Sequence, residues 1–129
     1  MMLLEDTSVW VRHLREGNAR LASALERGEV WTHPWVIGEL ACGRLSDRAT
    51  LLGHRRALPS TPVASVDGAL ALIERRSLMG RGVGWVDVQL LASALLAGTR
   101  TWALDRRLST VAEELGVAVG IVGSRLRPS

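Results

Sequence analysis

The stretch LLEDTS at residues 3–8 decides the fold, because it predicts a short buried strand that turns directly into a helix. The apolar run stops at Asp6, and Thr7 and Ser8 are residue types that favour the start of a helix. The stretch WALDR at residues 102–106 repeats this order near the other end of the chain: an extended run, an aspartate and a helix. Both junctions are typical of a fold in which strands alternate with helices.

Hydrophobic periodicity extends this pattern over the whole chain. The expected strands are Met2–Glu5, Val30–Trp31, a short strand at Val63, Thr101–Leu104 and Val117–Val122. Helices are expected to begin near Thr7, Asn18, Thr32, Asp47 and Asp67, and to cover Trp85–Leu96 and Arg106–Leu115. No repeat and no linker divides the 129 residues, so we predict one domain, residues 1–129, with an α/β fold and a central, mostly parallel sheet.

The composition excludes several classes of protein, because all 16 basic residues are arginines and lysine is absent. P-loop nucleotide hydrolases and Schiff-base enzymes both need a lysine, and receiver domains carry one as well. The net charge of +3 and the pI of about 10.8 are compatible with a polyanionic partner. The same arginines would also suit an ordinary solvated surface, so charge alone leaves both interpretations open.

The sequence also predicts where the protein resides. No segment reaches the roughly 20 apolar residues that a membrane-spanning helix needs, and the N-terminal residues do not resemble a secretory signal. The single cysteine, Cys42, cannot form an internal disulfide, which suits a reducing compartment. We therefore expect a cytoplasmic protein without membrane contact, in which Cys42 is a buried structural thiol.

Two aspartates follow predicted strands, and we expect them to converge. Asp6 and Asp105 each stand at a strand-to-helix junction. In open parallel sheets the ligand site lies beyond the carboxyl ends of the strands, so both side chains should meet there. Taken singly, either aspartate could equally be a helix cap.

Two further acids lie in apolar surroundings. Glu39 belongs to an otherwise apolar helical segment, and Asp87 lies in the first turn of the strongest predicted helix. The alternatives are an ion pair with an arginine for Glu39 and a favourable helix-dipole interaction for Asp87. Four carboxylates in one small domain suit Mg²⁺ or Mn²⁺, which prefer oxygen ligands, whereas the histidines show no zinc spacing.

At these residues the sequence resembles the PIN-domain family, and specifically its VapC-like toxins. DTSVW at residues 6–10 is similar to the N-terminal Asp-Thr-Ser motif of the family, and IGELACG at residues 37–43 is similar to its Glu-Leu-x-x-Gly helix. GWVDVQLLA at residues 84–92 resembles the segment that supplies the third acid, and WALDRRL at residues 102–108 resembles the strand-end acid motif. The four motifs occur in the family's order over almost the whole chain.

The resemblance implies a three-layer α/β/α sandwich and metal-dependent hydrolysis of RNA. Asp6, Glu39 and Asp87 would hold Mg²⁺ or Mn²⁺ directly or indirectly, and Asp105 would complete the catalytic site. Ala103 stands where many relatives have Thr or Asn, which leaves open whether Asp105 touches the metal. Ser8 would either orient an acid or cap the helix.

The resemblance also implies partners. A cognate VapB-type antitoxin would insert its C-terminal segment into the groove, and the protein would form a homodimer. Candidate contacts to the RNA backbone are Arg12, Arg15, Arg81, Arg106 and Arg107. The alternatives are a PIN nuclease that acts outside a toxin pair and a catalytically inactive PIN-fold module that only binds protein.

Overall fold

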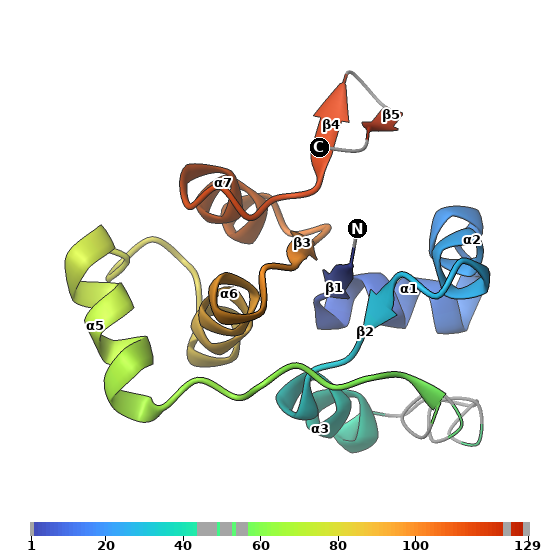
Figure 1. Ribbon diagram of the computed structural model, residues 1–129, viewed down its shortest axis with the longest axis horizontal. Helices are drawn as coiled ribbons and strands as arrows, with labels where there is room; N and C mark the ends of the chain where they lie inside the picture. The colour runs from blue at the N-terminus through green and yellow to red at the C-terminus, as the bar shows by residue number, and fades with distance from the viewer. Residues whose placement is uncertain (1, 44–48, 50–52, 54–56, 123–124, 128–129) are drawn as a thin grey trace.

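Three short parallel strands form the central sheet, in the order β2-β1-β3 (Figure 1). β1 (Leu3–Glu5) lies between β2 (Val30–Trp31) and β3 (Arg100–Trp102). The register pairs Leu4 with Trp31 on one side and with Thr101 on the other. All three residues of β1 are buried, as expected for a parallel strand that helices cover on both faces. The predicted α/β fold with a parallel sheet is confirmed.

The helices cover this sheet from both sides. The computed structural model describes residues 2–43, 49, 53, 57–122 and 125–127, so the helix expected after Asp47 lies outside the described residues. Figure 1 shows α1 and α2 on one side of the strands and α6 on the other, with α5 packed outside α6 and α7 beside β3. The helix bounds are α1 (Thr7–Glu16), α2 (Ala19–Glu26), α3 (Pro34–Cys42), α5 (Val66–Arg76), α6 (Trp85–Ala97) and α7 (Arg106–Glu114).

Local sequence signals set most helix ends. The Asn18 side chain accepts hydrogen bonds from the backbone N–H groups of Arg20 and Leu21, and this cap starts α2 as predicted. Gly98 ends α6 in the left-handed conformation, with φ 70°, which a glycine adopts without strain. α3 begins one residue later than expected, because His33 rather than Thr32 caps it.

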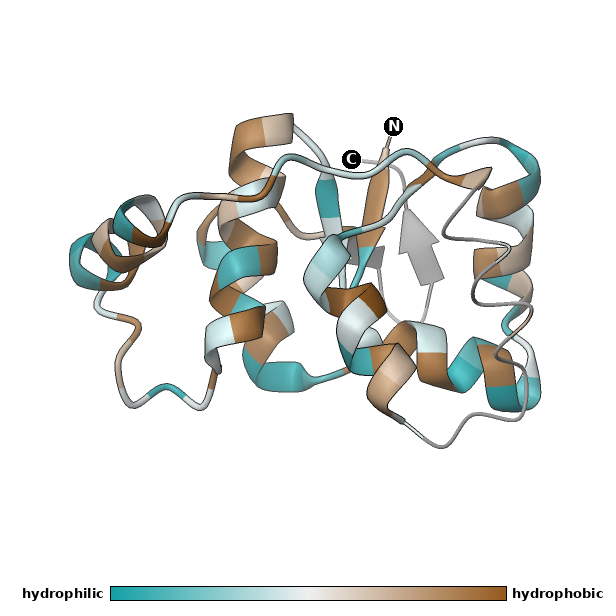
Figure 2. Ribbon diagram, turned by 90° about the horizontal axis from the view of Figure 1, so that it is seen from below, coloured by the Kyte–Doolittle hydropathy of each residue, from teal (hydrophilic) through white to brown (hydrophobic). Residues whose placement is uncertain are grey.

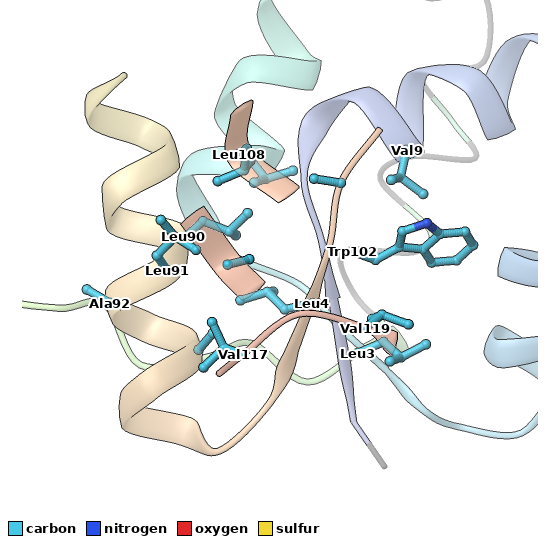
Figure 3. Packing of buried hydrophobic residues seen from close by; sticks show 14 of the residues in the cluster. Leu3, Leu4, Val9, Leu90, Leu91, Ala92, Trp102, Leu108, Val117 and Val119 are labelled. Carbon is cyan, nitrogen blue, oxygen red and sulfur yellow. The ribbon is translucent and has the colours of Figure 1, made fainter. Parts of the chain in front are cut away.

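The hydrophobic core lies on both faces of the sheet. In Figure 3, Leu4 of β1 points toward Leu90 and Leu91 of α6, whereas Leu3 lies on the opposite side together with Trp102. All of these side chains are less than a tenth exposed. The alternation follows from the two-residue period of a strand, and it buries β1 between two helical layers.

The segment that enters α5 differs from its prediction. Val63 lies in no strand, and the backbone bonds of this segment instead join Thr32 to Pro59 and Thr61. The proline Pro62 has no N–H group to donate to a ladder, which ends the pairing before Val63. The chain then crosses the molecule to α5, which stands at its edge (Figure 2).

The last β-branched run splits in two. Ala118 forms an isolated parallel bridge with Thr101, next to β3. Beyond it, β4 (Gly120–Val122) pairs antiparallel with β5 (Arg125–Arg127), a strand that the sequence did not indicate. The sheets are therefore mostly parallel, as predicted, with one antiparallel pair added.

The prediction for Cys42 is wrong. Cys42 was expected to be buried, but it is exposed at the end of α3. Two residues after the buried Leu40, it lies about 200° further around the helix and so faces away from the core. Among the described helices none has the length and apolar character that crossing a membrane requires.

Candidate active site

The four predicted acids line one pocket beyond the carboxyl ends of the strands. Asp6 directly follows β1, Asp105 follows β3, and α3 and α6 contribute Glu39 and Asp87. The pocket has a volume of about 320 Å³. Its other lining residues are Thr7, Ser8, Val36, Val86 and Leu90. Four acids that belong to four different helices or helix caps, about a hundred positions apart at most, therefore line one small cavity.

Asp6 is fixed by hydrogen bonds to a single carboxylate oxygen. Its Oδ1 atom accepts from the Ser8 hydroxyl at 2.5 Å and from the Val9 backbone N–H at 3.3 Å. The Ser8 hydroxyl also accepts from the Leu104 backbone N–H at 3.2 Å, which ties the end of β1 to the loop after β3. Asp6 is thus both a helix cap and a pocket residue, and Ser8 orients it.

Asp87 and Asp105 likewise combine a helix-end bond with a place in the pocket. Asp87 Oδ2 accepts from the Gly84 backbone N–H at 3.0 Å, across the first turn of α6. Asp105 Oδ1 accepts from the N–H groups of Arg107 and Leu108, at 2.9 and 3.2 Å, and so caps α7. Each cap uses one carboxylate oxygen, so the second oxygen carries none of these helix-end bonds.

Glu39 is held by a residue whose contact the sequence did not reveal. The Thr7 hydroxyl donates to Glu39 Oε1 at 2.5 Å, from the first residue of α1 to the middle of α3. The sequence suggested an arginine as the alternative partner of Glu39. A threonine next to Asp6 gives no signal for this bond, because the two residues are 32 positions apart and meet only when the helices pack.

A hydrogen bond joins the N-terminal end of α3 to α6, the two helices that carry Glu39 and Asp87. His33 is buried, and its Nδ1 atom accepts from the Trp35 N–H at 3.1 Å. The neutral ring therefore carries its proton on Nε2, which lies 3.0 Å from the Ser93 hydroxyl of α6. Burial lowers the pKa of His33, which keeps the ring neutral.

The electrostatics of the pocket disfavour full ionisation. Burial raises the pKa of Asp6, and the nearby charge of Asp87 raises it further. Burial likewise raises the pKa of Asp87, and the charges of Glu39 and Asp105 add to this effect. The backbone hydrogen bond from Leu108 is the largest cause that lowers the pKa of Asp105. Asp6 and Asp87, the inner acids of the pocket, repel each other when both are ionised. A cation between them would offset this repulsion and favour the ionised forms.

The donor set fits a hard divalent cation. Four carboxylates, with the hydroxyls of Thr7 and Ser8 close by, supply the oxygen ligands that Mg²⁺ and Mn²⁺ prefer. Within the described part of the chain, no three His, Cys, Asp or Glu side chains stand close enough to form a finished metal cluster. The acids line the pocket wall without meeting at one point, so binding would require their side chains to move.

If Asp6 holds a metal ion for RNA cleavage, as the sequence resemblance implies, Ser8→Ala is expected to lower cleavage about 10- to 100-fold, the usual loss when the partner of a metal ligand is removed. The variant leaves Asp6 without its 2.5 Å hydrogen bond and leaves the Leu104 N–H without its acceptor. Ser65→Ala is the matched control, because it removes the serine hydroxyl that caps α5, outside the pocket. Cleavage rates and melting curves of both variants check this. Equal activities of the two would contradict a role for Ser8 in orienting Asp6.

Comparison with known proteins agrees with this architecture. The family model for the PIN domain matches residues 3–114. Ribonuclease VapC32 of Mycobacterium tuberculosis, in strains CDC 1551 / Oshkosh and ATCC 25618 / H37Rv, is 46% identical to this chain over 119 residues, 92% of this chain and 96% of the relative. The crystal structure of PAE2754 from Pyrobaculum aerophilum has the same fold, with a TM-score of 0.58, 17% identity and 90% of each chain covered. The chain therefore belongs to the PIN-domain family, and within it to the VapC type.

Proposed function

We propose that this protein is a metal-dependent endoribonuclease that hydrolyses RNA phosphodiester bonds as the toxin of a VapBC-type pair. One observation carries the proposal: four carboxylates from separate elements line one pocket, and the inner ones repel each other. The name of the relative from Mycobacterium tuberculosis, which describes that protein as a ribonuclease, supports RNA as the substrate.

Asp6, Glu39 and Asp87 would hold Mg²⁺ or Mn²⁺ in this pocket. When bound, the cation supplies positive charge that offsets the negative charge developing on the phosphate. The chain itself keeps the acids in place, through Ser8 at Asp6 and Thr7 at Glu39. These hydrogen bonds limit the reorganisation that binding and reaction would otherwise require.

Asp105 acts from the rim of the pocket. Its side chain is 43% exposed, and it is committed through Oδ1 to the first turn of α7. Three apolar side chains also line the pocket, the buried Val36 and Leu90 and the half-buried Val86. They reduce the access of water and strengthen the attraction between the inner carboxylates and a cation. We therefore expect Asp105→Asn to lower the rate of RNA cleavage less than Asp6→Asn does.

The proposal includes two protein partners, a VapB-type antitoxin and a second copy of this chain. Apolar surface is available for such contacts on α5, where Val66 is 58% and Leu70 48% exposed, and on α6, where Leu95 is 44% and Leu96 67% exposed. Co-expression with the product of an adjacent small gene, followed by purification and light scattering, would reveal both partners.

The first test is cleavage of purified tRNA, rRNA and mRNA by antitoxin-free protein with Mg²⁺ or Mn²⁺. We expect metal-dependent fragments that are absent with EDTA and absent for Asp6→Ala, since that variant lacks a central carboxylate. Calorimetric titration with Mn²⁺ measures metal binding separately. If wild type and Asp6→Ala were equally inactive and neither bound metal, the protein would instead be a binding module.

A further inference from the structure

Arg107 lies against a glycine at the rim of the pocket. A Cβ atom added to Gly82 would lie 2.6 Å from Arg107 Cδ, closer than real Cβ contacts come, and 3.0 Å from its Nη1 atom. Gly82 also has φ +82°, a conformation that other residues rarely adopt. The backbone conformation therefore favours glycine at this position, and the Arg107 side chain occupies the space that a Cβ atom would take.

The loop that carries Gly82 is itself anchored to α7. Arg81 donates to both carboxylate oxygens of Glu114, at 2.7 and 2.6 Å, which joins the loop to the end of α7. Arg107 lies in the first turn of the same helix. The loop and the helix thus form a seat for the Arg107 side chain, whereas the Arg81 guanidinium is paired with Glu114.

The charge of Arg107 acts on the site. Its Nη2 atom lies 3.5 Å from Asp105 Oδ2. Its charge adds to the lowering of the pKa of Asp105 by the backbone N–H of Leu108, and it partly offsets the rise in the pKa of Asp87 that burial causes. The Arg107 side chain is nevertheless 66% exposed. An exposed ion pair of this length contributes little to stability, so the guanidinium can exchange Asp105 for another anion.

We propose that Arg107, seated on Gly82, binds a backbone phosphate of the RNA strand as that strand enters the acidic pocket. This inference rests on the proposed nuclease function and names the residue that recognises the substrate. Four carboxylates repel a polyanion, so positive charge beside them favours the approach of a strand. A guanidinium suits this role because its planar donors match the oxygens of a phosphate.

The test compares Arg107→Ala with Arg27→Ala, which removes the same charge at the opposite edge of the sheet. Arg27 pairs with Glu29, just before the amino end of β2. In cleavage assays we expect Arg107→Ala to raise KM about tenfold with kcat within about twofold, as loss of one phosphate contact predicts. Arg27→Ala should match wild type in both constants.

Binding provides a readout that does not depend on catalysis. Fluorescence anisotropy of a 20-nucleotide RNA, measured with Mg²⁺ in the Asp6→Asn background, gives Kd over a range of salt concentrations. Arg107→Ala should weaken binding about tenfold and reduce the salt slope by about one unit, because one phosphate contact is lost. An unchanged slope, or an equal loss in Arg27→Ala, would overturn the proposal. Failure of the wild type to cleave or bind RNA would instead refute the proposed function.

A double-mutant cycle tests the seat itself. Gly82→Ala should weaken RNA binding about as much as Arg107→Ala, because the new Cβ displaces the arginine side chain. If Gly82 acts through Arg107, adding Gly82→Ala to Arg107→Ala should cost no further RNA affinity. Additive losses would contradict the seat, and melting curves would show whether each variant is folded.

Discussion

Asp87→Asn is expected to lower kcat/KM for RNA cleavage by at least about a thousandfold, because a divalent cation contributes several kcal/mol to the stabilisation of the transition state. The amide keeps an oxygen that can accept the Gly84 N–H, so the first turn of α6 should remain intact. What the variant loses is the negative charge that would help to hold the cation in the pocket.

The same variant should be more stable than wild type without metal. Burial and two neighbouring carboxylates raise the pKa of Asp87 in the folded protein. A raised pKa means that this group favours folding below its unfolded value of about 3.8 and disfavours folding as pH rises through the folded pKa. Asp87→Asn removes that penalty at neutral pH.

Melting curves at pH 7, with and without Mn²⁺, measure both effects apart from activity. Wild type should gain melting temperature with Mn²⁺, and Asp87→Asn should lose most of that gain. Asp67→Asn is the matched control, because Asp67 also lies in the first turn of a helix, α5, but is exposed and outside the pocket. An Asp87→Asn variant that still cleaves RNA at the wild-type rate would exclude Asp87 from the metal site.

Glu5→Leu is expected to stabilise the protein by about 1–3 kcal/mol at neutral pH, the usual cost of burying a polar group without a partner. The Glu5 side chain is 1% exposed, and within the described residues neither of its carboxylate oxygens has a hydrogen-bond partner. Strand alternation places it on the same face of β1 as Leu3, where Trp102 also lies (Figure 3). A leucine would complete this apolar layer.

The pH dependence of stability identifies Glu5 as the cause. Burial raises the pKa of Glu5 well above its ordinary value of 4.5. Its contribution to stability is therefore greatest below about pH 4.5 and is lost as pH rises through the raised pKa. Urea unfolding of wild type, Glu5→Leu and Glu5→Gln from pH 4.5 to 8 should show flatter profiles in both variants. RNA cleavage should persist in Glu5→Leu, because Glu5 does not line the pocket. A variant that is less stable than wild type at every pH would contradict this prediction.

Local signals in the sequence were enough to predict the strands of the central sheet, the helices around them and the positions of the four acids. The short apolar run before Asp6 and the helix-favouring residues after it predict the end of β1, and Asn18 caps its helix through neighbours two and three residues away. The wide apolar face of α6 likewise marks it from composition alone. Such features depend on bonds between near neighbours, so periodicity and capping rules can predict them.

The expectation that Asp6 and Asp105 converge followed from topology, because parallel strands end at one edge. Val63 and Cys42 were misplaced because their environment depends on distant partners. Pairing near Val63 is decided by Thr32, about thirty residues earlier, and the exposure of Cys42 depends on which face of α3 the core covers.

The sequence by itself determined the family, the three strands of the central sheet and the helices around them, and it singled out the four acids that line one pocket, since all of these follow from local patterns. Only the tertiary structure decided how the acids are held and which groups act on them. The hydrogen bond from Thr7 to Glu39 and the contact of Arg107 with Gly82 each join segments that are far apart in the chain. The burial of Glu5 without a hydrogen-bond partner likewise depends on the elements that pack around β1. These contacts arise when helices and strands pack, and side-chain geometry across such interfaces leaves no periodic trace in a single sequence.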